Sequence, residues 1–399
     1  MFSKAKEIFR EDVPWKQILL AFIFTATAYG IYKGVLDNYL AEIVGVGEFD
    51  RGVTEFFREL PGVLLIIIFA ALAEFSAEFV YKIGAVVMII GLCMISFLPP
   101  IKVMVIAAIF MYSLGEHIQL GMKNSIMLQY AKPDKGGAAL GIRSSVDEIG
   151  SLIGFLIVSA SLVIFSGRIA YKNFFMVAAA VMIVAMLLAL RVYGTSEQDK
   201  NRRRIYLRKK YSKYYILEVF YGSRKQVFFT FGPYVLILFY GANAATISFL
   251  LAVSAVCCSL AAPFVGRIID KVGYKAVMVS DTLLLLIVCF FYGFAHHLFP
   301  RNIALIVCCI NYVLDSVISL CSMASNVYVQ DLSDSTEEMR ATISTGISVN
   351  HVITLAIALF GGWIWQTLGI ETLFIISAFL GLCNSAIAAT IKTSKQKMA

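Results

Sequence analysis

The sequence predicts an all-α polytopic membrane protein with twelve transmembrane helices in two pseudo-symmetric six-helix bundles. Apolar residues make up 59% of the 399-residue chain and charged residues only 15%, whereas soluble domains average roughly 25% charged residues. Apolar runs close to the roughly 20 residues that cross a bilayer recur on both sides of a polar segment at the middle of the chain. A soluble core of this size does not need so many runs that are apolar on every face.

The polar segment at the middle is dense in basic residues. Residues 191–225 contain eleven Lys and Arg against three acidic residues, a net charge of +8 that equals the charge of the whole chain. Such a block stays on the cytoplasmic side of a membrane, and we interpret its cations as topology signals that touch anionic lipid headgroups, not as a nucleic-acid surface. The predicted divisions are a cytoplasmic N-terminal segment (1–17), a first bundle (18–191), a basic cytoplasmic linker (192–225), a second bundle (226–391) and a cytoplasmic tail (392–399).

Twelve helices fit between these limits, and the distribution of Lys and Arg predicts their orientation. With both termini in the cytoplasm, the inner loops, tails and linker hold 26 basic residues and the outer loops hold five. This bias follows the positive-inside rule and predicts a multi-pass protein of the plasma (inner) membrane. We expect the helices near residues 18–39, 53–75, 80–98, 101–122, 138–165, 172–191, 226–241, 244–265, 274–295, 302–329, 341–366 and 371–391.

No pattern in the chain indicates catalysis or a resident metal. All eight cysteines lie inside apolar runs without Cys/His ligand spacing, so we interpret them as small packing residues. No Gly-rich phosphate loop, HExxH helix or nucleophile elbow occurs. The sequence therefore predicts a protein that is not an enzyme and that needs no cofactor or metal.

Short similarities between the two halves indicate an internal duplication. Three pairs recur in the same order, which is the pattern expected of parallel six-helix repeats. The pairs are 145–152 with 348–355, 81–84 with 270–273, and 16–17 with 225–226.

One loop resembles that of a known family, the major facilitator superfamily (MFS). Its residues are similar to the family motif G-x-x-x-D-[RK]-x-G-x-[RK] and fall between the eighth and ninth predicted helices, where the family's second copy lies. The resemblance implies two bundles that rock about a central cavity, and an inner gate that this loop closes. The Asp would cap neighbouring helix N-termini. The motif residues are Gly266, Asp270, Lys271, Gly273 and Lys275.

The corresponding loop of the first half departs from the family pattern. Residues 77–84 read AEFVYKIG, so Tyr81 stands where the motif has Asp and Ala77 where it has the first Gly. We expect Glu74 or Glu78 to supply the missing carboxylate of a latch in the first half.

An outer group of polar and ionisable residues lies in the first two predicted helices. An ionisable side chain costs roughly 2.5–3.5 kcal/mol at mid-bilayer, so each is a candidate for function. Lys33 and Asp37 have the i,i+4 spacing that allows a direct pair, and we expect Lys33 and Arg58 to bind an anionic group of a substrate. A structural ion-pair network near the outer interface is the alternative. The group comprises Tyr29, Tyr32, Lys33, Asp37, Glu55, Arg58 and Glu59.

An inner group lies in the fourth and fifth predicted helices. His117-x-x-x-Gly121 is similar to the R-x-x-x-G motif of the family's fourth helix, with His in place of Arg. Because His gains and loses a proton near neutral pH, this departure favours proton coupling; a His satisfied by a buried partner is the alternative. The proton-coupling candidates are Glu116, His117, Arg143, Asp147 and Glu148.

The second half carries fewer charged residues inside its predicted helices. We expect its polar residues to hydrogen-bond the substrate from the opposite wall of the cavity. They are Tyr234, Tyr240, Asn311, Asp315, Asn350 and His351.

Together these patterns predict a monomeric secondary active transporter that moves a small polar, anionic organic solute by alternating access. The proton is the predicted coupling ion, and membrane lipid surrounds the chain. A multidrug or amphiphile exporter of the same fold is one alternative, although the fifth predicted helix has Gly150 and Gly154 without the Pro of the exporters' motif. A transporter-like receptor or scaffold that moves nothing is the other.

Overall fold

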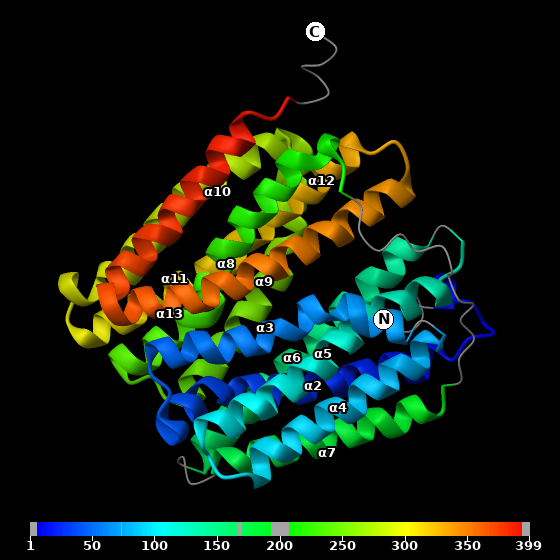
Figure 1. The fold of residues 1–399 in the computed structure, drawn as a ribbon, viewed down its shortest axis with the longest axis horizontal. Coiled ribbons are helices and arrows are strands. Elements are labelled where there is room, and N and C mark those ends of the chain that lie inside the picture. Colours follow the sequence, from blue (N-terminus) through cyan, green and yellow to red (C-terminus); the bar gives the residue numbers. More distant parts are fainter. Residues whose placement is uncertain (1–5, 73, 134, 166–169, 193–206, 393–399) are drawn as a thin grey trace. The chain divides into compact units, whose positions relative to one another are not determined.

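A computed structural model of the chain describes residues 6–72, 74–133, 135–165, 170–192 and 207–392. The described residues are helical apart from turns and short connections, and they contain no β-strand, only an isolated bridge between Phe9 and Ala131 (Figure 1). The predicted all-α fold class is confirmed. Some predictions fall outside the described residues, namely those for the chain ends (1–5 and 393–399), the middle of the linker (193–206) and the predicted outer loop at residues 166–169.

The chain separates into two compact units. The first comprises residues 1–45, 60–201 and 243–252. Within it α2 packs against α6 and α7, and α4 packs against α5 and α7. A buried cluster that includes Phe22, Tyr81 and Tyr130 forms its core. Its helices are α2 (Trp15–Asn38) with the π-helical extension η1 (Tyr39–Val44), α4 (Ala77–Phe97), α5 (Lys102–Tyr130), α6 (Gly136–Ile164) and α7 (Tyr171–Leu190).

The second unit comprises residues 46–59, 202–242 and 253–399. Here α8 and α10 pack against α13, and α11 packs against α10 and α8. A buried cluster around Tyr214, Met278 and Val329 forms its core. Its elements are η2 (Lys209–Tyr211), α8 (Ser212–Tyr240), α10 (Tyr274–Leu298), α11 (Arg301–Ile318), η3 (Ser319–Ser322), α12 (Met323–Leu332) and α13 (Thr336–Ala389).

Two helices divide their residues between the units. The first half of α3 (Glu48–Ala71) belongs to the second unit, and the beginning of α9 (Ala244–Val272) belongs to the first. The compact units therefore depart from the two halves of the sequence at these two helices.

Twelve membrane-length helices can be traced in the described residues. Nine segments are long and apolar enough to cross a membrane. One of them, α13, bends at Gly369, where φ is 88°, so it supplies both the eleventh and the twelfth helix. The more polar α3 and α8 complete the set.

The seventh helix begins earlier than the expected residue 226. It starts at Ser212, because Tyr214, Leu217 and Tyr221 form an apolar stripe at spacings of three and seven residues, and all three are buried. The surrounding charges obscure this stripe in the sequence. Arg224, expected in the linker, consequently lies inside α8 and is only 2% exposed.

A nearly constant offset, or register, relates each helix of the first half to its counterpart in the second half. Helix starts in the second half follow their counterparts by 196 residues (Glu48 and Ala244) to 200 residues (Gly136 and Thr336). In this register Gly273, which precedes α10, corresponds to Ser76, whose hydroxyl caps α4. None of the three predicted matches has this offset: 145–152 with 348–355 differs by 203 residues, 81–84 with 270–273 by 189 and 16–17 with 225–226 by 209. These alignments are therefore wrong, and residues 81–84 lie inside α4 and not in a loop.

Glycines bring α6 close to α2, as the spacing of Gly150 and Gly154 indicates. A Cβ atom at Gly154 would lie 2.4 Å from the carbonyl oxygen of Thr27, and one at Gly30 would lie 2.3 Å from that of Ser151. Small residues that allow such backbone approach are typical of helix contacts in membranes.

We expect Gly154→Ala to lower the stability of the first unit by about 1–3 kcal/mol, because the added methyl group must displace α2 backbone. Gly141→Ala on the same helix is the matched control, since a Cβ atom there meets nothing within 4 Å and alanine favours a helix. Thermal unfolding of the purified variants in detergent checks this. Equal melting temperatures for the two variants would contradict the packing described.

Candidate functional site

A buried ion network surrounds Glu55 in the second unit. The Glu55 side chain is fully buried, and its Oε2 accepts a hydrogen bond of 2.9 Å from Arg51 Nη1. Its Oε1 accepts from Arg58 Nε (2.9 Å), Arg58 Nη2 (2.6 Å) and Gln226 Nε2 (3.0 Å). The i,i+3 and i,i+4 spacing on α3 places both arginines beside one carboxylate, while Gln226 comes from α8.

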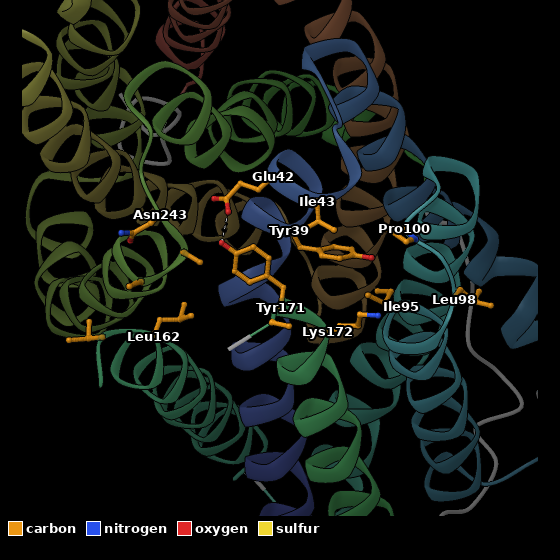
Figure 2. A pocket seen from close by; sticks show the side chains of 14 residues that line it. Tyr39, Glu42, Ile43, Ile95, Leu98, Pro100, Leu162, Tyr171, Lys172 and Asn243 are labelled. Carbon is orange, nitrogen blue, oxygen red and sulfur yellow. Dashed lines mark hydrogen bonds between the residues drawn. The ribbon is translucent and has the colours of Figure 1, made fainter. Parts of the chain in front are cut away.

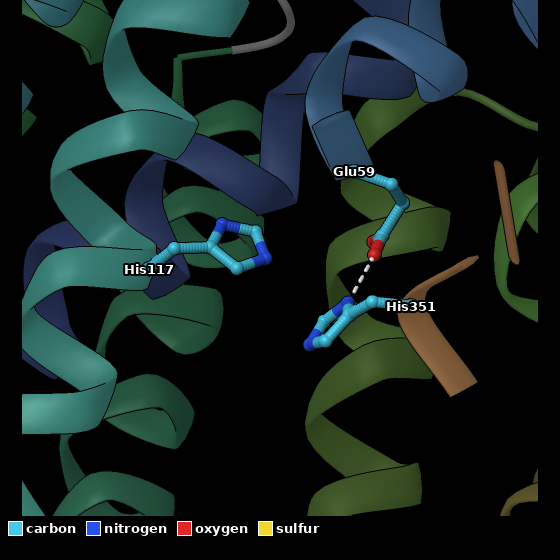
Figure 3. Close-up of side chains that lie close together, drawn as sticks. All are labelled: Glu59, His117 and His351. Atoms are coloured by element: carbon cyan, nitrogen blue, oxygen red, sulfur yellow. Dashed lines mark hydrogen bonds and ion pairs between the residues drawn. The ribbon is translucent and has the colours of Figure 1, made fainter. Parts of the chain in front are cut away.

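Glu59 extends this network to α13. It is 6% exposed and pairs with Arg58. His351 Nδ1 lies 3.0 Å from Glu59 Oε2, and Thr354 Oγ1 donates to the same oxygen over 3.4 Å. Figure 3 shows the side chains of His351 and Glu59 pointing toward one another. Two arginines balance two glutamates here, and His351 adds an imidazole to the network.

A second buried cluster in the same unit centres on Arg224. Its guanidinium is 3.9 Å from Asp281 on α10, and Asp281 also accepts a hydrogen bond from Tyr221. Neither Nη1 nor Nη2 of Arg224 makes a hydrogen bond within the described part of the chain. The terminal N–H groups of a buried arginine ordinarily donate hydrogen bonds. No described residue accepts one from Nη1 or Nη2 of Arg224.

Asp315 on α11 is the other carboxylate within electrostatic range of Arg224. Its side chain is 6% exposed. No hydrogen bond or ion pair of its carboxylate occurs among the residues that the structure describes. Buried ionisable groups in membrane proteins mark substrate paths and proton relays, and Asp315 combines burial with this lack of a close partner.

The sequence prediction missed Arg224 and Asp281. Arg224 was assigned to the linker because its helix starts fourteen residues before the apolar run does. The helical spacing of Leu217, Tyr221 and Arg224 places all three on one face of α8. This periodicity in the sequence could have shown that Arg224 lies on the buried face. Asp281 stands alone in an otherwise apolar run, which is a signal in itself.

The outer group is paired, and its members fall into different units. Lys33 and Asp37 belong to the first unit and form the predicted pair, with Nζ 2.9 Å from Oδ2. Glu55, Arg58 and Glu59 belong to the second unit. Both cations expected to bind an anion, Lys33 and Arg58, already have carboxylate partners within their own unit.

The tyrosines of the outer group take packing positions in the first unit. The ring of Tyr32 is buried, with its centroid 3.9 Å from that of Tyr112. Tyr29 is partly buried on the same helix. Tyr32 therefore contributes to the core of the unit through stacking.

The inner group is organised around Asp147 in the first unit. Its carboxylate lies between Arg143 (2.7 Å) and Lys123 (2.8 Å). Lys123 was missed because α5 continues to Tyr130, eight residues beyond the expected end.

The predicted proton-coupling residues around Asp147 have varied surroundings. His117 Nδ1 lies 2.9 Å from the carbonyl oxygen of Ser113 in its own helix. Glu116 is partly buried and Glu148 is exposed. A proton-coupling role for this group stays a prediction.

The polar residues predicted in the second half bond to other parts of the second unit. Such bonds hold the helices in place and satisfy buried polar groups. The contacts are Tyr234 Oη to the Val46 carbonyl (2.6 Å), Cys308 Sγ to Tyr240 Oη (3.7 Å), Asn311 Nδ2 to the Val307 carbonyl (2.7 Å) and Asn350 Nδ2 to the Glu218 carbonyl (3.5 Å).

The predicted gate loop is a single residue long. Gly266, Asp270 and Lys271 lie in α9, Gly273 alone connects it to α10, and Lys275 follows in α10. Gly273 has φ 90°, a conformation that glycine adopts without a steric cost. Asp270 is exposed and forms no ion pair within the described residues, so its latch role stays a prediction. In the first half, buried Glu78 accepts a hydrogen bond of 3.0 Å from Tyr130.

A groove of about 640 Å³ lies in the first unit, at the ends of several helices. At its wall Tyr171 Oη donates a hydrogen bond of 2.6 Å to Glu42 Oε2; Figure 2 shows this pair among the residues that line the groove. Lys172 and Asn243 add further polar groups among the apolar residues that line it. None of the predicted site residues lines this groove.

These features of the two units define a class of protein. Two compact helical units of membrane-spanning length, with ion networks buried inside them, are the architecture of a membrane transporter. The sequence profile of the Major Facilitator Superfamily matches residues 18–213 and again 214–397. The chain belongs to this superfamily. The membership indicates a transporter and not an enzyme, and the two matches agree with the repeated halves.

Solved structures share the fold at low sequence identity. A mutant of the nucleoside transporter NupG has a TM-score of 0.76 and 16% identity, covering 94% of this chain and 99% of that one. A POT family transporter in complex with 5-aminolevulinic acid has a TM-score of 0.71 and 14% identity, with coverages of 93% and 94%. A bacterial homolog of the human lysosomal transporter Spinster has a TM-score of 0.67 and 12% identity, with coverages of 93% and 95%. No curated protein matches the sequence.

We expect Glu55→Gln to destabilise the protein by about 3–5 kcal/mol, because it removes the counter-charge that buried Arg51 shares with the partly buried Arg58. Asp334→Asn is the control: it removes a pair with Lys210 at 2.7 Å in which Asp334 is 85% exposed, and exposed pairs contribute little. Melting temperatures in detergent compare the two. Equal melting temperatures for Glu55→Gln and Asp334→Asn would contradict a stabilising role of the Glu55 network.

Proposed function

We propose that the protein is a proton-coupled secondary active transporter of a small, polar, anionic organic solute, working by alternating access. The observation that carries this proposal is Arg224: it is buried, and both terminal nitrogens lack a hydrogen bond within the described residues. Arginine binds carboxylate and phosphate groups through paired N–H donors. A solute with such a group would satisfy donors that the protein leaves unused.

The charges around Arg224 supply a reason for proton coupling. With Asp281 and Asp315 both ionised, these two acids and Arg224 carry a net charge of −1; Lys225, which also acts on Asp315, is exposed to solvent and therefore screened. A bound anion would bring this to −2 in a low-dielectric site, which is strongly unfavourable. Proton uptake by one of the acids offsets the added charge. Asp315 is the better candidate, because Asp281 already accepts a hydrogen bond from Tyr221.

The pair of Glu59 and His351 is a second titratable element in the same unit. Its components join α3 to α13, so a change of protonation there would alter how these two helices hold together. We assign it to the coupling of conformational change to protonation. Asp147 is less suited to take up a proton, because it lies between two cations that stabilise its ionised form.

The related structures are compatible with this substrate class. One is a nucleoside transporter and another is a POT family transporter in complex with 5-aminolevulinic acid. Nucleosides and 5-aminolevulinic acid are small and polar, which supports that part of the proposal. The position in the plasma (inner) membrane with cytoplasmic termini rests on the excess of basic residues in the predicted inner loops.

We expect Arg224→Gln to abolish binding of anionic solutes, and Arg224→Lys to weaken it about tenfold, because lysine keeps the charge without the paired donors. A thermal-shift screen of small carboxylates and phosphates on purified protein identifies the test solute. Its affinity is then measured by calorimetry. Lys209→Gln, an exposed cation outside the cluster, is the control. Unchanged affinity in both Arg224 variants would contradict the assignment.

We expect Asp315→Asn to uncouple transport from the proton gradient, because the asparagine mimics a permanently neutral acid. Proteoliposomes containing this variant should exchange labelled for unlabelled solute but should not accumulate it under an imposed pH gradient. Asp334→Asn should accumulate solute as the wild type does. A wild-type protein whose uptake ignores the pH gradient would overturn proton coupling.

A further inference from the structure

Two histidines and one glutamate meet at one end of the second unit, away from the Arg224 cluster. His296 and His297 form the last turn of α10, and Glu371 follows the bend of α13 at Gly369. The two Nε2 atoms lie 3.2 Å and 2.9 Å from the same oxygen, Oε1 of Glu371. We propose that these three side chains form a binding site for a divalent transition metal such as Zn²⁺, which links α10 to α13.

The spacing of the three side chains is close to what a tetrahedral metal requires. Zinc lies about 2.0–2.1 Å from imidazole nitrogen and about 2.0–2.2 Å from carboxylate oxygen, so neighbouring ligand atoms in a tetrahedron lie roughly 3.3–3.5 Å apart. The nitrogen-to-oxygen distances fall just short of this range. Potential ligand atoms of all three residues lie within 4.8 Å of one another. Small side-chain shifts would therefore admit the ion.

The donor set selects the kind of metal. Two imidazoles with one carboxylate are a known zinc ligand set that leaves a fourth position for water. Imidazole nitrogen suits Zn²⁺, Cu²⁺ and Ni²⁺, whereas Mg²⁺ and Ca²⁺ prefer oxygen ligands. The cluster should therefore discriminate strongly against the two alkaline-earth ions.

The surrounding structure holds the ligands in position. Gly369, at φ 88°, bends the chain so that Glu371 folds back: its Oε2 lies 2.8 Å from where a Cβ atom of Gly369 would be. The ring of Phe239 packs against His296, with centroids 5.2 Å apart, and the two histidine rings are 3.9 Å apart. Such support reduces the freedom that the ligands must lose on binding.

The ligands are also available to a metal from solvent. The His297 side chain is 59% exposed, and those of Glu371 and His296 are 29% and 21% exposed. His296 Nδ1 makes no hydrogen bond within the described residues, so the imidazole proton can reside there. The Nε2 lone pair is then free for coordination.

Binding would connect two helices that are far apart in the sequence, which gives a direct readout. A ligand that binds only the folded protein raises its melting temperature. Purified protein carrying no polyhistidine tag is stripped with chelator and titrated with Zn²⁺. We expect the melting temperature to rise with Zn²⁺ and not with Mg²⁺, independently of any transported solute.

Matched variants locate the effect. We expect His297→Ala and Glu371→Gln each to weaken Zn²⁺ binding by at least about 100-fold, since outer-shell losses alone weaken metal sites 10–100-fold. Glu337→Gln, an exposed glutamate on the same helix, should bind Zn²⁺ as the wild type does. Metal-free melting temperatures show whether each variant is folded.

Cobalt(II) provides a test that requires no variant. Tetrahedral Co²⁺ gives intense visible absorption, and we expect one such ion per wild-type chain, displaced by Zn²⁺. The proposal is wrong if wild-type protein shows neither these bands nor a Zn²⁺-dependent rise in melting temperature. It is equally wrong if folded His297→Ala and Glu371→Gln bind the metal with wild-type affinity.

Discussion

Charges buried in a membrane protein need partners, and this constraint organises the interior of both units. Glu55 shows it most fully: each of its oxygens is occupied, by two arginines from its own helix and a glutamine from α8. Removing one partner from such a site costs about 3–5 kcal/mol, because the remaining charge stays buried. The helices that carry these residues are therefore held in one arrangement by the requirement for charge balance.

The pairs follow a common construction. The pairs of Lys33 with Asp37, Arg51 with Glu55, Arg58 with Glu55 and Arg143 with Asp147 are local i,i+3 or i,i+4 contacts. Some networks add a residue from a helix distant in the sequence, as His351 does for Glu59. Arg224 departs from this construction. Its ion pair with Asp281 spans 3.9 Å, its guanidinium lies 4.8 Å from the centroid of the Tyr221 ring, and its Nη atoms make no hydrogen bond within the described residues. This difference separates a candidate binding group from a structural one.

Much of the fold follows from sequence patterns that act locally. Hydrophobic runs predicted twelve helices, and the loop around Asp270 indicated the superfamily. The pair of Lys33 and Asp37 followed from helical spacing alone. Helix ends were harder to predict: amphipathic turns continue α5 to Tyr130 and start α8 at Ser212, beyond the apolar runs. Lys123 and Arg224 were missed for this reason. Contacts between segments distant in the sequence decide which helices share a unit. The assignment of the first half of α3 to the second unit could therefore not be predicted.

The central claim, that anion binding at Arg224 is linked to proton uptake by Asp315, can be measured without transport. The test solute is added to detergent-solubilised protein in weakly buffered solution while the pH is recorded. We expect uptake of about one proton per solute bound, from the charge balance of the cluster, and no uptake in Asp315→Asn. Solute binding to the wild-type protein with no change in pH would contradict it.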